Sequence, residues 1–169
     1  MQVINGNWDL KENLQLFNEN IKYKSYYQHF IEGVEWKYTE YYKREKKRYL
    51  DGKVRKEYKS IEDLDLKYRY FDKLYRKIER EGFKSQREII KSEGIITNHG
   101  RGVVIRKPGD DIAIAIGRNG ELIFLDGRHR LNIVKMLYIQ NRNIKKIPVR
   151  VLVIHPEFIS SLEKKSKDF

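Results

Sequence analysis

The sequence predicts an α+β protein, a small mixed β-sheet with helices packed on it and an N-terminal helical extension. Up to about residue 94, the chain is rich in Tyr, Lys and Glu at helical spacing, and beyond Gly94 short Ile and Val runs separated by glycine replace this pattern. A length of 169 residues fits one domain. We divide it into a helical extension over residues 1–59 and an α/β core over residues 60–169.

The extension is expected to hold short helices over residues 10–18, 26–32 and 39–50. Gly33 and Gly52 lie where a helix would end with a left-handed residue. Helices of this length are not stable alone, so they must pack against the rest of the chain.

The longest predicted helix spans residues 60–81. It has one apolar stripe with alternating steps of four and three residues, formed by Leu64, Tyr68, Phe71, Tyr75 and Ile78. Ser60 and Asp63 form a capping pair at its start, and Gly82 ends it. A shorter helix is expected over residues 85–91.

The core begins with an interior strand over residues 112–116, where alternating Ile and Ala make both faces apolar. Asn119 and Gly120 predict the centre of a tight turn, followed by a returning strand over residues 122–125. We then expect a helix over 128–138, a strand over 147–154 and a short C-terminal helix over 156–169. Together with the earlier helices, these elements predict a mixed sheet of about four or five strands.

Composition limits the chemistry. The chain has no cysteine, which excludes disulfides, thiolate catalysis and cysteine-bound zinc. It has 36 Lys and Arg against 24 Asp and Glu, a formal charge of +12, which favours an anionic partner, although solvated helix faces explain much of the same composition. No apolar run is long enough to span a membrane and no export signal is visible, so we expect a cytoplasmic protein.

The candidate site is the turn Asp126, Gly127, Arg128, His129, Arg130, at a predicted strand-to-helix junction. Unpaired N–H groups and the helix dipole favour an anion at such a helix start. Gly127 would admit the ligand, and Arg128 and Arg130 would converge on phosphate oxygens. His129 would donate to phosphate or transfer a proton, and Asp126 would hold Mg²⁺, act as a base or cap the helix.

Other features have two readings. Residues 100–102 form a second phosphate loop or a simple turn, and Arg118 lies at a hairpin tip. The Tyr-Lys-Arg clusters at 41–49 and 68–77 resemble single-strand binders but also fit buried helix faces. Metal-ligand spacing is missing at three histidines, His29, His99 and His155.

The stretch IAIAIGRNGELIFLDGRHRLNIVKMLYIQNRNIKKIPVRVLVI resembles the core of the ParB/sulfiredoxin-like superfamily, and YFDKLYRKIEREGF resembles the preceding ParB helix. Gly127 and Arg130 match the phosphate-binding signatures of both ParB and sulfiredoxin. His129 matches the sulfiredoxin histidine, but Arg128 stands where sulfiredoxin has its catalytic cysteine, which excludes that chemistry. The Asp/His/Arg turn of the free serine kinase branch is most similar to residues 126–130.

This resemblance implies a nucleotide-phosphate-binding domain that takes ATP, ADP or CTP with Mg²⁺, as an NTP-dependent phosphotransferase, a kinase or an NTPase. No third ParB nucleotide motif, helix-turn-helix or dimerisation domain is visible, so a chromosome-partition clamp is not expected. The alternative is a DNA- or RNA-binding or regulatory protein that uses the same turn for backbone phosphate. A third reading is an interaction module with a vestigial pocket.

Overall fold

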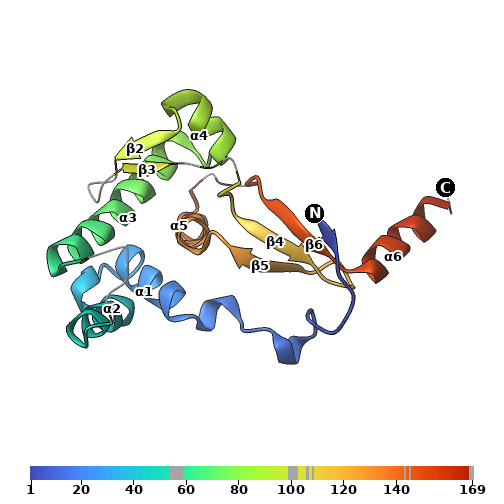
Figure 1. Cartoon of the computed structure of the whole chain (residues 1–169), viewed down its shortest axis with the longest axis horizontal. Helices are drawn as coiled ribbons and strands as arrows, with labels where there is room; N and C mark the ends of the chain where they lie inside the picture. The colour runs from blue at the N-terminus through green and yellow to red at the C-terminus, as the bar shows by residue number, and fades with distance from the viewer. Residues whose placement is uncertain are drawn as a thin grey trace.

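A computed structural model describes residues 1–53, 59–98, 103–105, 107, 109–142, 144 and 146–167. This part of the chain forms an α+β fold, as the sequence predicts. Figure 1 shows helix α5 (Arg128–Ile139) between two parts of the molecule, with the β-sheet on one side and helices α1 (Ile21–Phe30) and α3 (Ile61–Glu81) on the other. Among the described helices, none is long and apolar enough to cross a membrane.

The main sheet is mixed and has the strand order β1-β6-β4-β5. Its strands are β1 (Gln2–Val3), β4 (Ala113–Ile116), β5 (Leu122–Asp126) and β6 (Arg150–Ile154). β4 pairs parallel with β6 and antiparallel with β5, and Ala113 and Ala115 are buried, which confirms the predicted interior strand. β1 pairs parallel with β6, so the first residues of the predicted helical extension belong to the sheet.

The β4–β5 turn differs from the expected geometry. Gly117 N–H donates to the Glu121 carbonyl at 3.0 Å, and Gly120 N–H donates to the Gly117 carbonyl at 3.0 Å. Gly120 has a φ of +88°, whereas Asn119 does not have a positive φ. The centre of the turn is therefore Arg118 and Asn119, and Gly120 follows it as the left-handed residue that lets the strand return.

Side-chain caps define where the N-terminal helices begin. Asn20 caps α1, Thr39 caps α2 (Glu40–Leu50) and Ser60 caps α3, each by accepting a backbone N–H of the first turn. α3 ends at Gly82, as predicted. Residues 10–18 form two short 3-10 turns, η1 (Lys11–Asn13) and η2 (Phe17–Glu19), in place of the expected helix.

An aromatic cluster fills the space between these helices and α5. Its fully or nearly buried members include Tyr26, Trp36, Tyr41, Tyr42, Tyr68 and Phe71, joined by Ile133, Met136 and Leu137 of α5. The three buried tyrosines of the Tyr-Lys-Arg clusters, Tyr41, Tyr42 and Tyr68, therefore serve as core residues. The apolar side of α5 therefore packs on the helical layer.

The remaining elements surround this centre. Helix α4 (Gln86–Glu93) leads to the two-stranded sheet of β2 (Ile96–Asn98) and β3 (Val103–Ile105). Helix α6 (Pro156–Lys167) projects from the far end of the main sheet in Figure 1. His99 and the predicted second phosphate loop at residues 100–102 lie outside the described residues.

Candidate functional site

The predicted turn lies where β5 ends and α5 begins. Asp126 is the last residue of β5, and Gly127 is the N-cap of α5 with a φ of +85° and a ψ of 26°. A Cβ atom at Gly127 would lie 2.8 Å from the Cα atom of Ile112. The left-handed conformation and this backbone contact together require glycine at the junction.

The start of α5 is unusually basic. Its first turn holds Arg128, His129 and Arg130 without an acidic residue, and no side chain caps it. Helices α1 to α4 each have a side-chain cap. Because a helix N-terminus is electropositive, cations there are unfavourable unless an anion offsets them. The arrangement therefore favours an anionic ligand.

Asp126 directly precedes the N-cap residue of α5. Its Oδ1 accepts the N–H of Gly127 at 2.7 Å, and the residue is exposed. Gly127 is the N-cap residue and not part of the first turn. Asp126 therefore does not cap the N–H groups of the first turn of α5. In the described part of the chain, no group of three or more His, Asp or Glu residues could hold a metal. A Mg²⁺ ion held by Asp126 would thus need ligand oxygens to complete its coordination.

Arg128 has no hydrogen bond or ion pair to any described residue. Its guanidinium carbon lies 5.2 Å from the ring centroid of Phe124 and 5.9 Å from that of Phe17. The two rings, 5.3 Å apart and nearly perpendicular, fix the direction of the side chain while leaving its N–H groups for a ligand.

Arg130 points elsewhere. Its guanidinium carbon lies 4.3 Å from the ring centroid of Phe83, Nη1 lies 3.4 Å from Asp111 Oδ1, and Nη2 donates to the carbonyl of Lys84. Burial lowers the pKa of Arg130, while Asp111 beside it acts in the opposite direction. The two guanidinium groups do not converge as expected, and Arg130 ties α5 to the connection between α3 and α4.

His129 faces the aromatic cluster. Its ring stacks on Phe71 with a centroid distance of 4.4 Å and an interplanar angle of 22°, and Nδ1 lies 2.8 Å from the hydroxyl oxygen of Tyr26. Burial raises the pKa of Tyr26 well above its usual value, so this hydroxyl stays protonated and is able to donate to Nδ1. In that arrangement, Nε2 carries the hydrogen of the His129 ring.

Two other residues named from the sequence have structural partners. Arg118 donates from Nη2 to Asp9 Oδ1 at 2.8 Å and from its backbone N–H to Asp9 Oδ2 at 2.6 Å, and these bonds hold the pKa of Asp9 well below its usual range. His155 is fully buried, with Nε2 3.1 Å from the Gly6 carbonyl oxygen. Both contacts attach residues 6–9 to the sheet.

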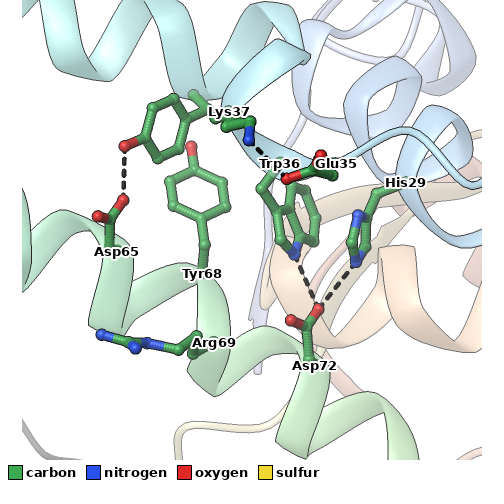
Figure 2. Close-up of a pocket in the computed structure, with 9 residues that line it drawn as sticks. His29, Glu35, Trp36, Lys37, Asp65, Tyr68, Arg69 and Asp72 are labelled. Carbon is green, nitrogen blue, oxygen red and sulfur yellow. Dashed lines mark hydrogen bonds and ion pairs between the residues drawn. The ribbon is translucent and has the colours of Figure 1, made fainter.

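The structure also contains a pocket that the sequence did not indicate, which we call the Trp36 pocket (Figure 2). It has a volume of about 400 Å³ and is lined by His29, Glu35, Trp36, Lys37, Tyr42, Asp65, Tyr68, Arg69 and Asp72. The available signal was the spacing of Asp65, Arg69 and Asp72, which lie on one face of α3 beside its apolar stripe.

Comparisons with models of protein families, with curated proteins and with solved structures gave no match. The resemblance to the ParB/sulfiredoxin-like superfamily therefore stays a prediction from the sequence. What the structure defines is a class: an α+β protein with a basic, uncapped helix start at a strand-to-helix junction.

Proposed function

We propose that this chain is a nucleotide-phosphate-binding domain of the ParB/sulfiredoxin-like kind, with the phosphates bound at the start of α5. The proposal rests on the guanidinium group of Arg128. Arg128 is the first residue of α5, which has no side-chain cap, and its guanidinium group has no polar partner in the described residues. Helix dipole, unpaired N–H groups and a forked cation all favour phosphate at this point.

Each residue of the turn has a distinct role in this proposal. Gly127 lets the backbone approach the ligand, Arg128 binds phosphate oxygens, and Asp126 holds Mg²⁺ together with those oxygens or accepts a proton from the acceptor. His129 stacks on Phe71 and is hydrogen-bonded to Tyr26, so its role is to hold α5 against the helical layer. Arg130 keeps the connection between α3 and α4 against α5.

Phosphoryl transfer or NTP hydrolysis is the chemistry that this inventory supports. Positioning of the phosphates and neutralisation of their charge lower most of the barrier in such reactions. ATP, ADP and CTP are the candidate ligands, since the turn contacts phosphates and leaves the base unspecified.

Calorimetric titration with ATP, ADP and CTP in the presence of Mg²⁺ tests the proposal. Arg128→Gln should weaken binding about tenfold or more, because it removes charge-assisted hydrogen bonds. Arg76→Gln is the matched control. Arg76 is exposed on α3, so this substitution removes the same charge at a position away from the turn. If none of the three nucleotides binds, or if Arg128→Gln binds as tightly as Arg76→Gln, the proposal is wrong.

One observation favours the second candidate, a nucleic-acid-binding protein. Lys135 Nζ lies 5.2 Å from the ring centroid of Phe17, the same ring that Arg128 approaches. The two cations are seven residues apart on α5, about 10 Å along the helix axis. This row is longer than one phosphate group and suits a continuing backbone.

Salt dependence separates the two candidates. For an oligonucleotide that contacts both cations, Lys135→Gln should reduce the slope of log K against log salt by about 0.9 on duplex DNA or about 0.7 on a single strand. For a mononucleotide at the start of α5, Lys135→Gln should leave the affinity nearly unchanged.

A further inference from the structure

We propose that the Trp36 pocket is a second ligand site, for a linear aliphatic diamine with two ammonium groups. This inference does not rest on the proposed function. It rests on three observations. Two carboxylates of α3 line the pocket, the hydrogen bonds of each carboxylate use only one of its oxygens, and aromatic rings line the same pocket.

The carboxylates belong to Asp65 and Asp72. They are seven residues apart, so they lie on the same face of α3 and about 10.5 Å apart along its axis. In Figure 2 both rise from α3 along one wall of the pocket, with Tyr68 between them. Two anionic groups separated in this way along one wall of the pocket suit a ligand with a cation at each end.

Hydrogen bonds fix each carboxylate through one oxygen. Asp72 Oδ1 accepts the indole N–H of Trp36 at 2.8 Å and lies 3.0 Å from His29 Nε2, while Asp65 Oδ1 accepts the hydroxyl of Tyr42 at 2.5 Å. Within the described chain, the Oδ2 atoms of Asp65 and Asp72 have no hydrogen bond, and neither carboxylate has a Lys or Arg ion pair. Tyr42 and Trp36 are neutral donors and orient the carboxylates without cancelling their charge, whereas His29 forms an ion pair with Asp72 when its ring is protonated.

Aromatic rings form the inner surface of the pocket. Trp36, Tyr42 and Tyr68 are almost fully buried, and all three line the pocket. Such rings accommodate a methylene chain and attract an ammonium group through the negative face of the ring. A volume of about 400 Å³ has room for a chain of several methylene groups with both ends.

Two cationic side chains, Lys37 and Arg69, also line the pocket and affect which ligands it can bind. Lys37 is paired with Glu35 at 2.9 Å. Arg69 is exposed and has no ion pair in the described residues, and Figure 2 shows its guanidinium directed away from Trp36 and His29. For a diamine, Arg69 is a like charge that opposes binding, whereas a zwitterion such as an amino acid would use it. Arg69 therefore distinguishes the two ligand classes.

Trp36 supplies the readout. The chain has two tryptophans, so Trp8→Phe leaves Trp36 as the single tryptophan, next to Asp72, and excitation at the red edge of the absorption band selects it over the tyrosines. Titration of this full-length variant with 1,4-diaminobutane and spermidine should give a saturable change in emission. n-Butylamine, which has one ammonium group, should bind at least about tenfold more weakly, because one of the two charged contacts is lost.

Substitutions then test the two carboxylates. Asp65→Asn and Asp72→Asn should each weaken diamine binding about tenfold or more. Glu79→Gln makes the same charge change on α3 outside the pocket and should leave binding unchanged. Asp65→Asn keeps the contacts of Trp36 with Asp72, so it remains informative if Asp72→Asn fails to fold.

Arg69→Gln gives the decisive comparison. For a diamine, removal of the like charge should tighten binding. A weakened response in Arg69→Gln, equal binding of n-butylamine, or no saturable signal with either amine would overturn the proposal. Arg128→Gln should bind the diamine as tightly as the parent chain, which keeps this result separate from the test of the proposed function.

Discussion

Replacement of Gly127 by alanine should destabilise the protein by about 2–5 kcal/mol, the sum of two costs. The first is conformational, since alanine at a φ of +85° and ψ of 26° costs about 1–2 kcal/mol. The second is steric. The new Cβ would lie 2.8 Å from Ile112 Cα and 3.3 Å from Ile112 N, which are backbone atoms that cannot rotate away, and overpacking of this kind costs about 1–3 kcal/mol.

Urea unfolding of Gly127→Ala beside Gly52→Ala measures the two costs separately. Gly52 has a φ of +71°, but a Cβ atom there would meet nothing within 4 Å. Gly52→Ala should therefore show the conformational cost alone, and Gly127→Ala should lose about 1–3 kcal/mol more. If both variants lose the same free energy of unfolding, the contact between Gly127 and Ile112 does not determine the residue at this junction.

Two other predictions concern charged groups. Lys67→Met should destabilise the protein by about 1–3 kcal/mol, because it removes the Lys67 Nζ atom 3.2 Å from the fully buried Glu45 carboxylate, which keeps Arg48 Nη1 at 4.0 Å from its Oε1. A Glu45→Leu/Lys67→Met double variant should recover most of this loss in urea unfolding. A loss below about 1 kcal/mol would show that Glu45 is solvated when Lys67 is absent. Asp9→Asn should lower the melting temperature at neutral pH, because Arg118 holds the pKa of the Asp9 carboxyl below its unfolded value. That stabilisation is complete above about pH 4 and is lost as the pH falls through the folded pKa, so a difference between Asp9→Asn and wild type that already shrinks between pH 7 and 5 would contradict it.

Most elements of the fold were predictable because their signals are local. Ser60 and Gly82 mark the ends of α3, and the apolar stripe between them has helical spacing. The Ile-Ala alternation at residues 112–116 likewise identifies an interior strand. Caps, periodicity and left-handed glycines each act within a few residues, so the sequence shows them directly.

Elements that depend on distant partners were not predictable in the same way. β1 has two residues, Gln2 and Val3, and it is a strand because β6 lies beside it. The turn centre at Arg118 and Asn119 accompanies the contact of Arg118 with Asp9, more than one hundred residues away. Neither contact has a signature in the neighbouring residues.

The location of the candidate site was predictable, but the directions of its side chains were misjudged. The strand-to-helix junction lies at residues 126–127, where the sequence placed it. Arg128 and Arg130 are separated by two helical positions, which is about 200° around the axis of α5. Once the helix began at Arg128, the two guanidinium groups had to diverge, as they do toward Phe124 and Phe83.

The packing of α5 also determines which segments of the chain can be removed or exchanged without exposing the core. Ile133, Met136 and Leu137 are covered by the aromatic side chains of α1 to α3, so a fragment starting at residue 60 would uncover part of its own interior. Removal of the first sixty residues would therefore expose apolar side chains of α5 to solvent. A natural or engineered chimera that exchanges the β5–α5 segment must carry a matching α1 and α2 with it.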